Sequence, residues 1–269
     1  MRSFYINHKN VNLFCREFGT GETILMIHGA CVDSDYFTDV ARALAHDFHV
    51  VTYDRRGYGR SREQLDSDHS VSIQAEDAAI IIRRQGCACH IIAHSVGTSV
   101  AMELVQKYPE LIRTVLLYEP FRAEECDDER TTELLQISRW IHDGNVVKAM
   151  RAFLPMLGAK DSRARCASDE ETRHMQENFL CFLKKEFDTT MFFKPNINRL
   201  RSIRLYVGVG ECSRDLPNWF QAHRLAEQVS APVVYFPGGH SCAFALPMEF
   251  AWLAEGIMRR DSREPLNNM

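Results

Sequence analysis

One serine in this chain stands in a setting that suits a nucleophile. Ser95 follows an apolar run, and the small residues Ala93 and Gly97 flank it two positions away on either side. A serine that projects from a sharp strand-to-helix turn adopts an unusual backbone conformation, and such a turn accepts only small residues at these flanking positions. Backbone N–H groups at the start of the next helix would lie beside the serine, where they can stabilise an oxyanion. The pattern G-x-S-x-G, with alanine for the first glycine, therefore predicts a reactive serine.

The segments around this motif alternate between strand and helix signals. Short, mostly apolar runs predict strands, the first two of them a hairpin, at residues 3–7, 11–17, 24–27, 49–53, 89–93, 114–118, 203–209 and 233–236. Helical patterns predict helices at residues 36–46, 72–84 and 96–108, with Ser72 as the N-cap of the second. Because strands that alternate with helices build parallel sheets, we expect an α/β fold: a mostly parallel central sheet with helices on both faces.

This alternation stops in the middle of the chain. Residues 122–200 show helical patterns only, and strand signals resume after them. We therefore expect a core domain in two parts, residues 1–121 and 201–260, with a helical cap inserted after the sixth strand at 122–200. Residues 261–269 are polar, and we expect them to form a disordered tail.

Four motifs, taken in their order along the chain, resemble those of the α/β-hydrolase superfamily. They are His28-Gly29, the stretch DRRGYGRS at 54–61, His94-Ser95-Val96-Gly97 and Gly238-Gly239-His240. Each follows a predicted strand, and together they extend over nearly the whole chain. The resemblance implies the α/β-hydrolase fold, and the strand–turn–helix context of the serine motif agrees with it.

The resemblance also implies roles for individual residues. Ser95 would be the nucleophile, and His240 would be the general base that takes its proton. The backbone N–H groups of Val96 and Ala30 would form the oxyanion hole, with Gly29 as the alternative to Ala30.

The acid of the expected catalytic triad is not at the superfamily's usual position. A Ser–His pair needs a carboxylate that orients the imidazole and stabilises its charged form. Where most relatives place an aspartate, in a G-x-x-D context after the seventh strand, this chain has Ser213. Asp215, two residues further on, and Glu119, directly after the sixth strand, are the two carboxylates that can replace it. We favour Glu119, because fungal lactonases that open macrolides such as zearalenone resemble this chain there and have a Ser–Glu–His triad.

The expected cap is rich in large apolar residues, including Trp140, Phe153, Leu154, Met156, Leu157, Phe179, Phe182, Phe192 and Phe193. Most must form the core of the cap, since apolar stripes on helices usually do, and the others would line an apolar pocket. The residues that we predict to contact the substrate are Cys31, Tyr36, Trp140 and Phe192.

These features predict a serine hydrolase that cleaves a carboxylic ester or lactone of a small, largely apolar molecule through an acyl-enzyme on Ser95. Two alternatives stay open. The first is a carbon–carbon bond hydrolase that acts on a diketone. The second is a non-catalytic ligand-binding protein of the same fold, which Ser213 at the usual acid position favours.

Composition restricts the partners and cofactors. The formal net charge is -4 and no long block of one charge occurs, which argues against nucleic acid and against electrostatic attachment to a membrane. No segment approaches the roughly 20 apolar residues that span a bilayer. The nine cysteines include no C-x-x-C pair, and the eleven histidines are not at ligand spacings from them, so we expect no metal. The expected acyl transfer to water requires no organic cofactor either.

Nothing after Met1 resembles a signal peptide. We therefore expect a reduced, cytoplasmic protein whose cysteines are mainly core residues. Its expected partner is a small-molecule substrate, and a homodimer is the candidate assembly.

Overall fold

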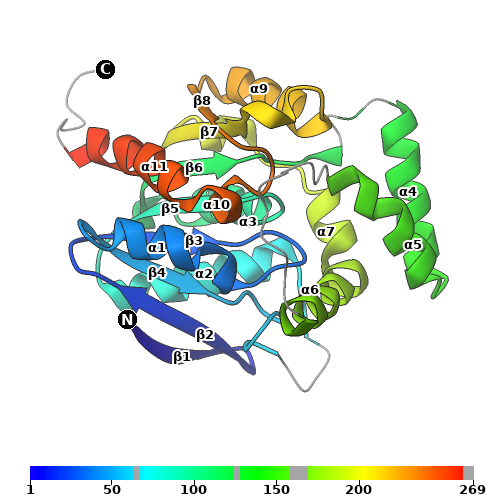
Figure 1. Ribbon diagram of the computed structural model, residues 1–269, viewed down its shortest axis with the longest axis horizontal. Coiled ribbons are helices and arrows are strands. Elements are labelled where there is room, and N and C mark those ends of the chain that lie inside the picture. Colours follow the sequence, from blue (N-terminus) through cyan, green and yellow to red (C-terminus); the bar gives the residue numbers. More distant parts are fainter. Residues whose placement is uncertain (63–66, 124–125, 127, 158–168, 263–269) are drawn as a thin grey trace.

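The centre of the molecule is a sheet whose eight strands, counted over the described part of the chain, are mostly parallel (Figure 1). The structure, a computed structural model, describes residues 1–62, 67–123, 126, 128–157 and 169–262. The strands lie in the order β1-β2-β4-β3-β5-β6-β7-β8. Their bounds are β1 Arg2–His8, β2 Val11–Phe18, β3 Glu22–Ile27, β4 Phe48–Tyr53, β5 Cys89–His94, β6 Ile112–Tyr118, β7 Arg204–Gly210 and β8 Val233–Phe236.

The pairing of the strands confirms the predicted topology. β1 and β2 form an antiparallel hairpin, and β2 is also antiparallel to β4. The remaining neighbours, from β4 through β3, β5, β6 and β7 to β8, are parallel. Because parallel strands end at the same edge, the loops that follow β3, β5, β6 and β8 meet above one edge of the sheet.

Helices cover both faces of the sheet, as predicted. Alternate residues of β3 point to opposite faces, so Ile24 and Met26 join one apolar cluster while Leu25 and Ile27 join the other. The first cluster includes α1 (Thr38–Leu44) and α11 (Pro247–Ser262), and the second includes α2 (Val71–Gln85), α3 (Gly97–Lys107) and α9 (Pro217–Val229). Short helices complete the core at η1 Ser34–Phe37, η2 Pro109–Leu111, η6 Glu211–Ser213 and α10 Cys242–Ala245.

The N-cap of α2 was predicted wrongly. The helix begins at Val71, and the hydroxyl of Ser70 rather than that of Ser72 accepts the capping hydrogen bond, from the N–H of Ile73 at 3.4 Å. Ser70 is held ready for this by its own N–H, which donates to the Asp68 carboxylate at 2.7 Å. Ser72 instead accepts a hydrogen bond from the Lys107 ammonium group at 2.6 Å, on the helix surface.

A run of helices separates β6 from β7 and gathers at one end of the sheet (Figure 1). The helices at this end are α4 Asp128–His142, α5 Val146–Phe153, η4 Leu154–Leu157, α6 Asp169–Cys181, η5 Phe182–Glu186 and α7 Phe187–Met191. The last helix before β7, α8 Ile197–Leu200, lies instead at the C-terminal end of α3, where Arg199 Nη1 donates to the carbonyl of Gln106 at 2.7 Å. The aromatic side chains of the other helices form a separate core that includes Phe153, Phe182 and Phe187, and this core also contains Tyr58 and Val96 from loops above the sheet. The helical segment therefore rests on the edge at which the parallel strands end. We refer to it below as the cap; the exact domain limits remain a prediction.

Two further expectations concern the tail and the cysteines. Helix α11 extends to Ser262, and the rest of the predicted tail, residues 263–269, lies outside the described residues. The prediction that the cysteines are mainly core residues holds for six of the eight whose surroundings are described, because Cys31, Cys126 and Cys181 pack against the cap core and three others are buried. Three are buried, three are intermediate, and Cys87 and Cys212 are exposed.

No helix within the described ranges combines the length and apolar character that crossing a membrane requires.

Candidate active site

Ser95 occupies the sharp turn between β5 and α3. Its φ is +55° and its N–H donates to the carbonyl of Tyr118 at 3.0 Å, which ties the turn to the end of β6. Gly97 allows the first turn of α3 to approach β3, because a Cβ there would lie 2.5 Å from the carbonyl oxygen of His28. A larger residue would push α3 away from the sheet. This close approach explains why the motif has a small residue at Gly97.

Three non-glycine residues with positive φ lie beyond the ends of three neighbouring strands. Cys31 follows β3 with a φ of +64°, Ser95 follows β5 with +55°, and Glu119 follows β6 with +47°. A left-handed conformation costs an L-residue about 1–2 kcal/mol, and strain of this kind concentrates at functional sites. The strained residues therefore mark the edge of the sheet at β3, β5 and β6 as the candidate active site.

Glu119, rather than Asp215, is the carboxylate that contacts His240. The Nδ1 of His240 lies 2.7 Å from Glu119 Oε2, and Glu119 is fully buried. Asp215 is exposed at the start of the loop before α9. Because the ionised carboxylate can only accept, Nδ1 carries a proton and donates it to Glu119. The neutral form of a histidine held in this way has its lone pair on Nε2.

The serine at the superfamily's usual acid position serves this carboxylate as a donor. The buried hydroxyl of Ser213 donates to Glu119 Oε1 at 2.6 Å, and the N–H of Gly210 donates to the same oxygen at 2.9 Å. Asn218 Nδ2 donates to Oε2 at 3.1 Å. With His240, Glu119 therefore accepts hydrogen bonds from four groups that come from β7, η6, α9 and the loop after β8.

These bonds decide the charge of the buried carboxyl group. Burial alone would raise the pKa of Glu119, but the hydrogen bond and charge of His240 outweigh it, with further help from Ser213 and Gly210. The pKa of Glu119 is consequently held below its ordinary value, and the group is ionised at neutral pH.

A narrow cavity of about 20 Å³ joins the predicted residues. Ser95, His240, Ala30 and Val96 all line it. The other lining residues are Phe121, Phe153, Met156, Met191 and Asn218. Phe153 and Met156 were noted in the sequence only among the apolar cap residues. Phe121, Met191 and Asn218 were missed, and only the amide of Asn218, which follows Pro217 in the first turn of α9, adds a polar side chain beside His240.

The four residues predicted to contact the substrate do not line this cavity. Trp140 packs at the edge of the cap core with the Lys148 ammonium group 4.2 Å above its ring. Phe192 packs edge-on against Phe187, and Cys31 borders the same core. The structure therefore gives no support to substrate contact by these three, because Trp140 and Phe192 pack within the cap and Cys31 packs against its core.

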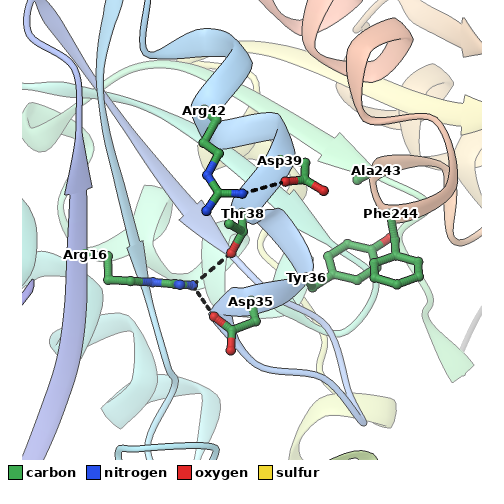
Figure 2. Close-up of a pocket in the computed structure, with 8 residues that line it drawn as sticks. All are labelled: Arg16, Asp35, Tyr36, Thr38, Asp39, Arg42, Ala243 and Phe244. Atoms are coloured by element: carbon green, nitrogen blue, oxygen red, sulfur yellow. Dashed lines mark hydrogen bonds and ion pairs between the residues drawn. The ribbon is translucent and has the colours of Figure 1, made fainter. Parts of the chain in front are cut away.

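Tyr36, the fourth, belongs to a different hollow (Figure 2). This hollow measures about 320 Å³ and is lined by Arg16, Asp35, Tyr36, Thr38, Asp39, Arg42, Ala243 and Phe244. In Figure 2 the charged side chains on its walls pair with one another, Arg16 with Asp35 and Arg42 with Asp39. Although it is larger than the cavity beside Ser95, it contains neither Ser95 nor His240, so its size does not identify it as the site of reaction.

His94 and Tyr118 hold the loop that carries His240. His94 Nε2 lies 2.9 Å from the carbonyl oxygen of His240, which can only accept, so Nε2 is the protonated nitrogen. The Tyr118 hydroxyl donates to the neighbouring carbonyl of Gly239 at 2.6 Å. Burial, followed by the charge of His240, lowers the pKa of His94 well below its ordinary value, so the ring is neutral. Tyr36 supports this arrangement by stacking on His94 with ring centroids 4.8 Å apart.

Comparison with known proteins defines the class. Residues 24–251 match the family described as "Alpha/beta hydrolase family". The chain belongs to this family and is a hydrolase.

Among its curated relatives, "Uncharacterized hydrolase YraK" of Bacillus subtilis (strain 168) is 26% identical over 273 residues, which cover 94% of each chain. "Putative carbamate hydrolase RutD" of Rhizobium rhizogenes is 29% identical over 244 residues, which cover 85% of this chain and 89% of the relative.

A solved structure with the same fold is Est816, described as an N-acyl homoserine lactone degrading enzyme. It has a TM-score of 0.72 at 21% identity and covers 94% of this chain and 99% of its own. At this level of identity the likeness concerns the fold alone. The residues that act, and the bond that they cleave, must be argued from the site itself.

Proposed function

We propose that this hydrolase cleaves a carboxylic ester or lactone of a small, largely apolar molecule through an acyl-enzyme on Ser95. The observation that carries the proposal is the 2.7 Å bond between His240 Nδ1 and Glu119, at a cavity that His240 shares with Ser95. Such a pair prepares Nε2 to accept the hydroxyl proton of a serine.

The proposed reaction has two stages. Ser95 Oγ attacks the carbonyl carbon while His240 Nε2 takes its proton, and the carbonyl oxygen becomes an oxyanion held by the N–H groups of Ala30 and Val96. His240 then gives the proton to the leaving alcohol, and the acyl group remains on Ser95. In the second stage His240 takes a proton from water while the water oxygen attacks the acyl carbon; the bond to Ser95 Oγ then breaks, His240 returns the proton to Oγ, and the acid is released. Glu119 stays ionised throughout and stabilises the imidazolium.

The lining of the cavity supports an apolar substrate. Phe121, Phe153, Met156 and Met191 form its walls, while Asn218 supplies one amide. At about 20 Å³ the cavity has room for little more than one water molecule, so a substrate must displace some of these side chains. The methionines are the natural candidates, since their unbranched side chains repack easily.

The test compares wild type with Ser95→Ala on a panel of p-nitrophenyl esters, acyl lactones and carbamates. Carbamates are included because of the relative named for their hydrolysis. The matched control is Ser99→Ala, which removes a buried hydroxyl one helical turn further on, where it faces the Thr190 carbonyl. We expect turnover of esters or lactones by wild type and by the control but not by Ser95→Ala. Turnover that survives in Ser95→Ala would refute the proposal, and so would activity confined to carbamates.

A further inference from the structure

The peptide group between Gly29 and Ala30 is held from behind by two side chains. Its carbonyl oxygen, that of Gly29, accepts a hydrogen bond from His28 Nδ1 at 2.8 Å and another from Arg55 Nη2 at 3.0 Å. The C=O and N–H of a trans peptide point in opposite directions, so whatever fixes the carbonyl of Gly29 also fixes the N–H of Ala30. Ala30 lines the cavity that contains Ser95. The N–H that would bind the oxyanion is therefore oriented by groups on the far side of its own peptide plane.

His28 can play this part in only one protonation state. Its Nε2 accepts the backbone N–H of Arg55 at 2.9 Å, which leaves Nδ1 as the donor to Gly29. Burial, together with the positive charge of Arg55, lowers the pKa of His28 to about 3. The ring is thus neutral across the working range of pH, and its tautomer does not change.

Arg55 links this peptide to the cap. Besides Gly29, its guanidinium donates to the carbonyl of His28 through Nε at 3.0 Å and to Glu186 Oε2 of the cap through Nη1 at 2.8 Å. Glu186 lies in η5 and accepts a further hydrogen bond from the Tyr58 hydroxyl at 2.9 Å. Arg55 and Glu186 are both fully buried. The Arg55 guanidinium therefore donates to two consecutive backbone carbonyls, those of His28 and Gly29, and it is itself held in place by the Glu186 carboxylate of the cap.

We propose that Arg55 is a positioning residue for the oxyanion hole, holding the Gly29–Ala30 peptide with its N–H toward Ser95, and that Glu186 of the cap holds Arg55 in this role. The inference rests on the proposed function of Ser95. It makes the cap a support for catalysis as well as a wall of the pocket. A positive charge on the carbonyl side also polarises the peptide, which strengthens its N–H as a donor.

The competing explanation is that Arg55 and Glu186 only join the cap to the core. Removing one charge would leave the other buried and unpaired, so the first variant removes both, as Arg55→Met with Glu186→Leu. Its matched control is Arg56→Met with Asp77→Leu. Arg56, next to Arg55 in sequence, and Asp77 form a fully buried ion pair of the same kind, with 2.6 Å between Arg56 Nε and Asp77 Oδ2. Arg56 also donates to a backbone carbonyl, that of Asp68.

A trifluoromethyl ketone reports on the oxyanion hole directly. Ser95 Oγ bonds to its carbonyl carbon, the C=O double bond becomes a single bond, the serine proton moves to His240, and the oxygen is left as an oxyanion. The corresponding alcohol occupies the pocket without this reaction. The experiment measures kcat and KM for a p-nitrophenyl ester, the affinities for ketone and alcohol, and the melting temperature of each variant.

We expect the Arg55/Glu186 double variant to lose roughly 10- to 100-fold in kcat, somewhat less than removal of an oxyanion donor costs. Its ketone affinity should fall by a similar factor, while KM and alcohol affinity change little. The control should lose stability without these losses. Equal kcat and ketone affinity in the two double variants would overturn the inference.

A second variant covers the case in which the double variant does not fold. Arg55→Lys keeps a positive charge for Glu186 but lacks the fork that reaches two carbonyls. It should show the same loss of kcat and ketone affinity, and wild-type values would overturn the inference. If wild type itself neither turns over esters nor binds the ketone more tightly than the alcohol, the proposed function fails, and the inference fails with it. Ester turnover by wild type with unimpaired Arg55 variants refutes the inference alone.

Discussion

Replacing Glu119 by glutamine tests the carboxylate that the structure places behind His240. The carboxylate accepts at Oε2 from His240 and Asn218, and at Oε1 from Ser213 and Gly210. A glutamine can keep its oxygen toward Ser213 and Gly210, and its NH2 group then faces His240. Because two donors cannot bond to each other, His240 would shift its proton to Nε2, and that nitrogen could no longer take a proton from Ser95.

The magnitude follows from these contacts. In serine proteases, replacing the aspartate of the triad by asparagine lowers kcat by about 10⁴, because the histidine then takes the wrong tautomer. We expect a loss of roughly 10³ to 10⁴ here, which corresponds to about 4–5.5 kcal/mol in the activation barrier. The hydrogen bond from Asn218 is also lost, and the one with His240 becomes a neutral bond in which the glutamine NH2 group donates to Nδ1; a charge-assisted bond is worth about 1.5–3 kcal/mol, and the loss is partly offset because no charge is buried any longer. The variant should therefore fold with a lower melting temperature.

The assay is kcat/KM for a p-nitrophenyl ester at pH 7, with the melting temperature as the check of folding. Asp215→Asn is the control, since Asp215 is exposed, and it should retain wild-type activity. A folded Glu119→Gln variant with near-normal activity, or a large loss in Asp215→Asn, would refute the reasoning.

Three further predictions concern pH, packing and the pocket. Since the folded-state pKa of Glu119 lies below its ordinary 4.5, its stabilisation is complete above that value and declines as pH falls through the folded pKa; acid unfolding curves should therefore depend less on pH in Glu119→Gln, and identical curves would contradict this. Gly97→Ala should lower the free energy of unfolding by roughly 3 kcal/mol in urea, because its Cβ would lie 2.5 Å from a backbone oxygen, and an unchanged midpoint would disprove the close contact. Met156→Ala should raise kcat/KM for longer-chain esters several-fold relative to short-chain esters, whereas Trp140→Ala should not, because Met156 lines the cavity and Trp140 does not. The opposite result would mean that the substrate pocket lies at Trp140 instead.

The sequence predicted the fold and the arrangement of its motifs because both depend on local patterns. Short apolar runs alternate with helical periodicity, and this alternation allows few topologies. Parallel strands then bring together the residues that follow them, which is why Ser95 and Glu119 lie beside the loop that carries His240. Glu119 was preferred to Asp215 because it lies at a strand end and because lactonases resemble this chain there, and of the two only Glu119 contacts His240.

The contacts that were missed depend on how helices are rotated about their axes and on groups distant in sequence. Trp140 and Phe192 turn into the packing of the cap, whereas Met191, next in sequence to Phe192, faces the cavity. A pattern of apolar residues identifies a buried stripe but does not divide it between core and pocket. The pair of Arg55 and Glu186 joins residues 131 positions apart, and no local motif indicates such a contact.

The central claim is a covalent intermediate on Ser95, and mass spectrometry of the acid-quenched protein tests it most directly. Wild type is mixed with p-nitrophenyl acetate, quenched during the burst of p-nitrophenol release, and digested. We predict one acetyl group on the peptide that contains Ser95, and none at this position in Ser95→Ala. Ester turnover without an acyl adduct, or with the acyl group on another residue, would contradict the account.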